Sequence, residues 1–348
     1  MKKRLRLTQR TSTEPSMVAG PARARKRATR MSLLVPGIMV IAFTAAPASA
    51  TTAGPNGLIA FSADTTSGTQ LFTVHPDGTH RRQITHVAGF AGNVDWSPDG
   101  RRIAFTVGTE TSSQVAVARA DGSQLRLLPQ PAGVLDDQPS FTPDGRRLYF
   151  ERLTVATNDD AIWTMSSDGR GQRRVLGPFP KGYVTDPNIS PDGRTMSFQG
   201  SDGSLVGPPP DKEMPAGLFT STPSGAHITQ IRPFSSDQTI KADWAPDGRR
   251  IAVTENANFF HSGDSANIVT MRPDGSGVRH LTTFHDGVTN AFFGSYSPDG
   301  RWVVFRLEQR GLFGLYRMHP DGSHRQVILP LSPVRPFLID WGSHDADK

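Results

Sequence analysis

Apolar and polar residues alternate in short runs along most of the chain, and each run ends at a turn-forming sequence. In one such run, Ile103, Phe105 and Val107 are separated by single residues. A period of two residues is typical of β-strands, and Pro, Asp and Gly between such runs favour tight hairpin turns. The pattern therefore predicts an all-β fold of short antiparallel strands.

One motif recurs at intervals of 45 to 55 residues and organises these runs. It has a large apolar residue, then Pro-Asp-Gly after one intervening residue, then a strand pattern. Pro presets φ at the first turn position, and Gly takes the positive φ that closes the hairpin. The copies contain Trp96, Pro98, Asp99 and Gly100; Phe141, Pro143, Asp144 and Gly145; Ile189, Pro191, Asp192 and Gly193; Trp244, Pro246, Asp247 and Gly248; and Tyr296, Pro298, Asp299 and Gly300, with a sixth start at Trp341.

A second turn motif, usually Asp-Gly, falls between successive copies of the first and also occurs six times. Two turns per repeat predict four short antiparallel strands, which is one blade of a β-propeller. Six repeats predict six blades, with the large apolar residue wedged between neighbours. The segment 55–61 resembles the strand that follows each Pro-Asp-Gly. We therefore expect Ile59 to pair with the strand of Trp341 and close the ring, which removes two open sheet edges.

The copies that read Trp-Ser-Pro-Asp-Gly-Arg-Arg-Ile-Ala-Phe resemble the WD-like repeat of the TolB-like superfamily. The resemblance covers about residues 54–345 and implies a single six-bladed, TolB-like propeller. In that family the propeller is commonly a non-catalytic platform for protein–protein contacts in the bacterial envelope. Relatives also occur in peptidases of the prolyl oligopeptidase type and in oligogalacturonate lyases.

Residues 1–50 have the organisation of an export signal. They hold ten basic residues and one acid, an apolar stretch at 31–46, and the small residues Ala48, Ser49 and Ala50. We expect cleavage after Ala50 and a protein that is extracellular, periplasmic or associated with the cell wall. It would then not be an integral membrane protein.

The net charge of +6 arises in this first segment, because the rest of the chain holds 28 basic and 31 acidic residues. A mildly acidic remainder disfavours nucleic-acid binding. The chain has no cysteine, so burial and backbone pairing must stabilise it without disulfides. We expect a monomer without a cofactor, whose partner is an unidentified protein or a cell-wall glycan.

The propeller topology places both sets of short turns at one end, and the variable loops at the other, where binding is usually found. Long loops at 199–217 and 254–267, together with several Phe residues, predict a binding surface at this variable end. The candidate binding residues are Phe259, Phe260, His261, Phe292, Phe293, Asp136 and Asp186.

A polar residue precedes the wedge position in every repeat: Asp95, Ser140, Asn188, Asp243, Ser295 and Asp340. Two interpretations are open. Asp95, Asn188, Asp243 and Asp340 could hold Ca²⁺ through oxygen ligands at the propeller pore. Alternatively, each side chain caps its own turn or backbone, as Asp, Asn and Ser commonly do.

Catalysis is the alternative to a binding role. His285 and Asp286, with Arg335, could form a lyase-like site for acidic polysaccharides or oligouronides with a metal at the pore, because such a reaction needs a base and a group that neutralises the uronate carboxylate. The sequence has no Gly-x-Ser-x-Gly nucleophile elbow, which disfavours a peptidase of the oligopeptidase type. We therefore expect a binding protein.

Overall fold

The computed structural model describes residues 53–109, 111–179, 182–201, 216–235, 240–256 and 265–343. All of them belong to one unit, residues 44–348. Every regular element in these ranges is a strand, and none is a helix. The strands are β1 (Ile59–Thr65), β2 (Gly68–Val74), β3 (Arg82–Gln83), β4 (Gly89–Trp96), β5 (Arg102–Thr109), β6 (Ser112–Arg119), β7 (Arg126–Leu127), β8 (Val134–Phe141), β9 (Arg147–Thr154), β10 (Asp159–Ser166), β11 (Arg173–Phe179), β12 (Val184–Ile189), β13 (Met196–Gly200), β14 (Ala216–Ser221), β15 (Thr229–Ser235), β16 (Ile240–Trp244), β17 (Ile251–Glu255), β18 (Asn267–Met271), β19 (Arg279–His280), β20 (Thr289–Tyr296), β21 (Val303–Gln309), β22 (Leu312–Met318), β23 (Gln326–Ser332) and β24 (Phe337–Trp341).

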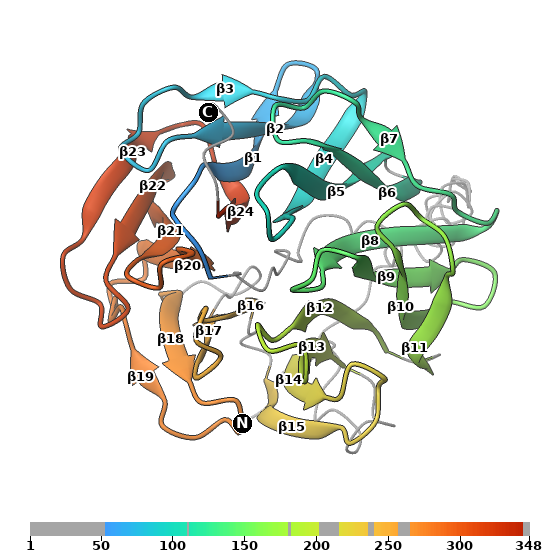
Figure 1. Cartoon of the computed structure of the whole chain (residues 1–348). Helices are drawn as coiled ribbons and strands as arrows, with labels where there is room; N and C mark the ends of the chain where they lie inside the picture. The colour runs from blue at the N-terminus through green and yellow to red at the C-terminus, as the bar shows by residue number, and fades with distance from the viewer. Residues whose placement is uncertain are drawn as a thin grey trace, which may run out of the picture. The chain divides into compact units, whose positions relative to one another are not determined.

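The strands form antiparallel sets of four around a common centre, as Figure 1 shows. Four sets are separate sheets: β8–β11, β12–β15, β16–β19 and β20–β23. The remaining two, β24 with β1–β3 and β4–β7, are joined into one sheet by a short parallel pairing of β2 with β4. The inner strand of each set contacts the inner strands of two neighbouring sets, in the order β4, β8, β12, β16, β20, β24 and back to β4. The all-β propeller predicted from the repeats is confirmed.

The last strand pairs with the first. Ile59 lies opposite Trp341 in the β1–β24 ladder, and the Trp341 indole Nε1 donates to Gly57 O at 3.1 Å. The pairing expected from the sequence is therefore present, and residues from the two ends of the described chain complete one sheet.

Both kinds of short turn lie at the same end of the sheets. In the first kind, Gly100 N donates to Ser97 O at 2.8 Å, and Gly100 has a φ of 64°, which favours glycine. The Ser97 hydroxyl also donates to Asp99 Oδ1 at 2.6 Å. The amide of Ala120, in the second turn of the same blade, donates to Arg101 O at 3.0 Å. The opposite end therefore carries the hairpins between second and third strands and the connections between blades; we call it the variable end.

The large apolar residue of each repeat packs between blades, as predicted. Trp244 of β16 is 1% exposed and packs against Leu218 and Ile231 of the preceding blade. Its indole Nε1 donates to Ser197 Oγ of that blade at 3.1 Å. Burying a large aromatic side chain contributes several kcal/mol, so these residues dominate the contacts between blades.

A β-bulge interrupts the pairing of the inner strands with their neighbours. Asn93, Gln138, Asp186 and Leu338 occupy equivalent places at these bulges, and all have φ between 51° and 60°. Left-handed backbone in a non-glycine residue is uncommon and often marks a functional or strained site. The bulges therefore mark the inner strands as places where a functional or strained site is commonly found.

Candidate functional site

The aspartates that precede the wedge positions join neighbouring blades. In three junctions, one Oδ2 accepts the backbone N–H of the wedge residue in the next blade: Asp95 from Phe141 at 2.6 Å, Asp243 from Tyr296 at 3.0 Å, and Asp340 from Trp96 at 3.0 Å. All three carboxylates are buried, and bonds of a charged acceptor to backbone amides are among the stronger hydrogen bonds.

Asn188 has a related role, because its Nδ2 donates to Ala242 O of the next blade at 3.0 Å. The observed contacts thus correspond to the backbone-capping interpretation, with the correction that the capped group belongs to the neighbouring blade. Within the described ranges, no group of three His, Cys, Asp or Glu side chains is placed to hold a metal ion.

A second set of buried acids lies where β8, β9, β10 and β12 meet. Asp137 is 7% exposed, and its Oδ1 accepts Asn93 Nδ2 and Thr106 Oγ1, both at 2.5 Å. Asp160 is 1% exposed and accepts the amides of Val184 at 3.1 Å and Ala161 at 2.9 Å. These bonds replace the water that each carboxylate loses on burial.

Burial raises the pKa of these acids. The pKa of Asp160 rises from 3.8 to about 8, chiefly because burial penalises its charged form. Burial, reinforced by repulsion from Asp160 and Asp137, raises the pKa of Glu151 well above its usual range. The pKa of Asp137 is also raised by burial, although its hydrogen bonds act in the opposite direction. The group therefore retains protons at a pH where exposed carboxyls are ionised.

The hydrogen bonds of Glu151 agree with a protonated carboxyl. Its Oε2 lies within hydrogen-bond distance of Thr185 Oγ1, which also lies 2.7 Å from Gln138 Oε1. Thr185 has one hydroxyl hydrogen, so it can donate to only one of these oxygens. A protonated Glu151 that donates to Thr185 leaves that hydrogen for Gln138, and the three oxygens Oε2 of Glu151, Oγ1 of Thr185 and Oε1 of Gln138 are then all paired.

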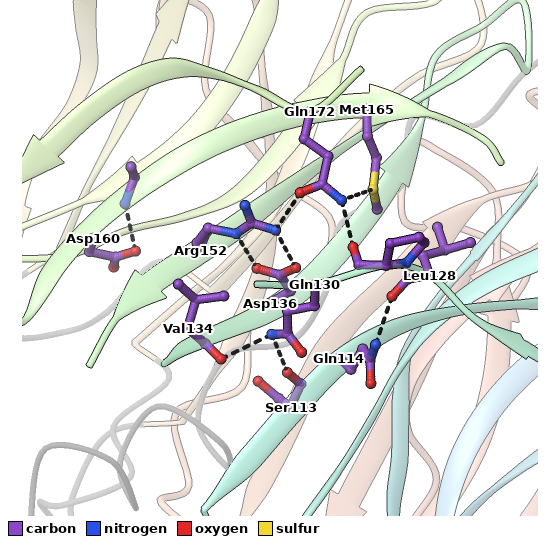
Figure 2. A network of polar contacts seen from close by, with 12 residues as sticks. Ser113, Gln114, Leu128, Gln130, Val134, Asp136, Arg152, Asp160, Met165 and Gln172 are labelled. Carbon is purple, nitrogen blue, oxygen red and sulfur yellow. Dashed lines mark hydrogen bonds and ion pairs between the residues drawn. The ribbon is translucent and has the colours of Figure 1, made fainter. Parts of the chain in front are cut away.

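Asp136 belongs to an internal ion pair. The Arg152 guanidinium donates Nε to Asp136 Oδ1 at 2.5 Å and Nη2 to Oδ2 at 2.7 Å, and both side chains are buried. Figure 2 shows this pair and the bond from Arg152 to Gln172 Oε1 at 3.0 Å. Arg152 also lies over the Trp163 ring, at 4.7 Å from its centroid. Asp136 was predicted to bind a ligand, and the structure places it instead in a bidentate pair that holds β8 against β9.

Asp186 is similarly internal. It is 1% exposed, and its Oδ2 accepts the amide of Ala242 at 3.1 Å and Gln199 Nε2 at 3.3 Å. It therefore links β12 to β16 and to β13. Asp186 was predicted to contact a ligand, but its buried side chain is not accessible from the surface.

A pair of arginines lies toward the variable end, between the β20–β23 sheet and β24. Arg306 of β21 is 5% exposed, and its guanidinium carbon is 3.9 Å from the ring centroid of Phe292 on β20. Its counter-ion is Glu308, with 3.8 Å between Nη2 and Oε2. Arg335, in the connection before β24, lies over the Phe313 ring at 5.6 Å. The Nε atoms of both arginines are buried and have no hydrogen-bond partner among the described residues.

The charge of Arg335 acts on Arg306. Burial, together with repulsion from Arg335, lowers the pKa of Arg306 to about 9, and Glu308 opposes this change only partly. Arg306 is buried and Arg335 is half-buried, and among the described residues their two positive charges face the one negative charge of Glu308. Such an imbalance is unusual because buried charges are normally paired.

Exposed apolar side chains lie at the variable end of the same blade. Val288, Leu312 and Val334 are 45%, 41% and 39% exposed, and we call them the variable-end patch. Arg310 N donates to Val288 O at 3.3 Å, which brings Val288 beside the β21–β22 hairpin that ends at Leu312. Ser332, two residues before Val334, pairs with Phe313, the neighbour of Leu312. The patch therefore combines two blade connections with one hairpin.

The residues of the catalytic alternative, His285, Asp286 and Arg335, differ in their exposure and contacts. His285 and Asp286 are exposed. Asp286 accepts the Thr289 hydroxyl and the amides of Thr289 and Val288, and these bonds lower its pKa to about 2. No hydrogen bond or ion pair joins His285, Asp286 and Arg335 among the residues that are described. Asp286 is therefore the cap of a turn.

The predicted aromatic binding residues have different outcomes. Phe293 is 3% exposed and packs with Tyr296, at 5.8 Å between ring centroids, so it belongs to the core, and its expected exposure is wrong. Phe292 is half-buried beneath Arg306. Phe259, Phe260 and His261, like the signal segment 1–50, lie outside the described residues.

Comparisons with known proteins agree with this fold. Residues 45–192 match the model of the TolB beta propeller domain. TolB from Acinetobacter baumannii is a similar solved structure, with a TM-score of 0.63 and 18% identity over 82% of this chain and 66% of that chain. Hydrazine synthase from Kuenenia stuttgartiensis has a TM-score of 0.64 and 13% identity over 83% of this chain and 47% of that chain. The described chain therefore has the fold of a TolB-like β-propeller, and its residues 45–192 match the TolB propeller domain.

Among curated proteins, an uncharacterised protein of Agrobacterium fabrum is 25% identical over 159 residues, which are 45% of this chain and 52% of the relative. The matches to three curated relatives span between 12% and 52% of the length of those relatives. Among the described residues, no helix is long and apolar enough to cross a bilayer.

Proposed function

We propose that the protein is an exported, non-catalytic binding platform of the bacterial cell envelope, and that a partner protein or a cell-wall glycan binds at the variable end. The observation that carries this proposal is the variable-end patch, in which Val288, Leu312 and Val334 expose apolar surface around one blade. Exposed apolar side chains that gather in one region commonly mark interaction surfaces.

The difference between the two ends of the propeller supports the same role. Each short turn satisfies its own polar groups: Thr142 Oγ1 donates to Asp144 Oδ1 at 2.6 Å, and this bond is the largest of several causes that lower the Asp144 pKa. Because the polar groups of these turns are already hydrogen-bonded to each other, few of them remain to bind a ligand. Binding residues are commonly found on the variable loops of a rigid scaffold, and here these lie at the opposite end.

The similarity to TolB supports a binding role in the envelope, because the resemblance to that family implies a platform for protein contacts. A lyase activity receives less support, since Asp286 is engaged in its own turn and is exposed beside His285.

Quantitative affinity capture from the producing cells tests the proposal. The wild-type protein is compared with a variant that carries Val288→Ser, Leu312→Ser and Val334→Ser. Leu127→Ser with Val278→Ser is the control, because these residues are 46% and 38% exposed but lie outside the patch. We expect the same partner to be retained by wild type and control and lost by the patch variant.

Equal capture by all three proteins would contradict the proposal. The catalytic alternative is assayed directly by absorbance at about 235 nm, where unsaturated uronides absorb, after incubation with uronate polymers. Turnover that His285→Ala abolishes would overturn a purely binding role.

A further inference from the structure

We propose that Arg306 and Arg335 form a binding site for a single carboxylate, adjoining the variable-end patch. The inference rests on the proposed binding role and names a chemical group that the ligand carries.

The position of Arg306 follows from the alternation of β21. Val304, two residues earlier on the same face, packs against Phe61 and Trp341 of the adjoining blade. The next residue on that face, Arg306, is therefore directed into the same junction between blades. Arg335, in the connection before β24, lies over the Phe313 ring, and Phe313 lies opposite Glu308, the ion-pair partner of Arg306, in the β21–β22 ladder. The charge of Arg335 also lowers the Arg306 pKa.

The charge of the site matches a monoanion. Among the described residues, two guanidinium groups face the single carboxylate of Glu308, 3.8 Å from Arg306, which leaves one positive charge without an ion-pair partner in that part of the chain. A single carboxylate would complete the balance, whereas a phosphate dianion would leave an excess negative charge in a partly buried place. Arginine is also the side chain best suited to planar, two-point recognition of a carboxylate.

The aromatic rings orient the guanidinium groups. Phe292 lies beneath Arg306 at 3.9 Å, and Phe313 lies beside Arg335 at 5.6 Å. When a ring covers the face of a guanidinium, its N–H groups remain available at the edge, in the plane where carboxylates bind. The same rings offer apolar surface to the part of the ligand that bears the carboxylate.

Isothermal titration calorimetry at constant ionic strength tests the proposal with four probes: acetate, D-galacturonate, D-galactose and inorganic phosphate. Acetate and galacturonate separate a bare carboxylate from one borne on a sugar, and galactose is the neutral counterpart of galacturonate. We expect saturable binding of at least one of the two carboxylates, weaker binding of phosphate and none of galactose.

The variants are Arg306→Gln, Arg335→Gln and the control Arg317→Gln. Arg317 is also stacked on an aromatic ring, that of Trp302 at 4.5 Å, but belongs to the far end of β22. We expect at least a tenfold loss of carboxylate affinity in both site variants and none in the control. Arg335 is only half-buried, so Arg335→Gln remains a test if Arg306→Gln folds poorly.

No saturable binding by wild type, tighter binding of phosphate than of carboxylate, or unchanged affinity in Arg335→Gln would overturn the carboxylate site. This outcome is distinguishable from failure of the binding platform. The capture experiment alters the apolar patch and leaves both arginines in place, so each proposal can fail while the other stands.

Discussion

The buried acids at β8, β9, β10 and β12 should make stability fall as pH rises. Folding raises the Asp160 pKa from 3.8 to about 8, so the folded protein holds a proton that the unfolded chain releases above pH about 4. The stabilising contribution is complete below pH about 4 and is lost as pH rises through about 8. One proton corresponds to about 1.4 kcal/mol per pH unit, so we expect the free energy of unfolding to fall by about 2–3 kcal/mol between pH 5 and pH 7.

Asp160→Asn isolates this effect. The Asn amide nitrogen cannot accept one of the two backbone N–H bonds that Asp160 now accepts, so the variant should be about 1–3 kcal/mol less stable at pH 5. Its stability should then change less with pH than that of wild type. Glu151→Gln should flatten the profile at a smaller loss, because its side-chain amide can still donate to Thr185.

Urea unfolding followed by tryptophan fluorescence at pH 5, 6, 7 and 8 measures these profiles. Asp286→Asn is the control: the Asp286 pKa is lowered to about 2, so its contribution is complete above pH about 4 and should not vary over this range. A wild-type profile that is flat or rises from pH 5 to pH 7, or an Asp160→Asn profile parallel to wild type, would refute the assigned protonation.

Three further variants test the packing between blades. Trp244→Ala removes a side chain that is 1% exposed and should lower the free energy of unfolding by about 3–5 kcal/mol in urea titrations. Asp340→Ala leaves the buried amide of Trp96 without its acceptor and should lower it by about 1–3 kcal/mol, whereas Asp340→Asn should recover most of the loss; equal effects of the two would contradict the hydrogen-bond role. Phe293→Ala should lower the melting temperature much more than Phe292→Ala, because only Phe293 is fully buried, and the reverse order would show that the two roles have been exchanged.

The sequence was sufficient to predict the architecture because turn chemistry and strand period repeat together. Pro98, Asp99 and Gly100 specify a turn locally, and Trp96 marks the junction that the turn positions. Even the pairing of Ile59 with Trp341 followed, since an incomplete repeat at each end predicts that the two combine.

The charged groups were harder to predict because burial in a blade depends on its neighbours. In β21, the charged residues Arg306 and Glu308 alternate with apolar residues, a pattern that usually indicates that one face of the strand is toward solvent. Here the adjoining blade covers that face, so Arg306 is buried. Phe293 was misplaced for a related reason: it lies within β20, Thr289–Tyr296, where it packs against Tyr296.

The pairing of β1 with β24 has a consequence for the order of events during folding. The Trp341 indole and its acceptor Gly57 O are 284 positions apart, so this ladder cannot form until nearly the whole described chain has been synthesised. Contacts of such long range are slow to form, because the intervening chain must first lose much of its freedom. Until then the edge of β1 that pairs with β24 lacks its hydrogen-bond partners. At that stage nascent molecules are most prone to bind chaperones or to aggregate with one another.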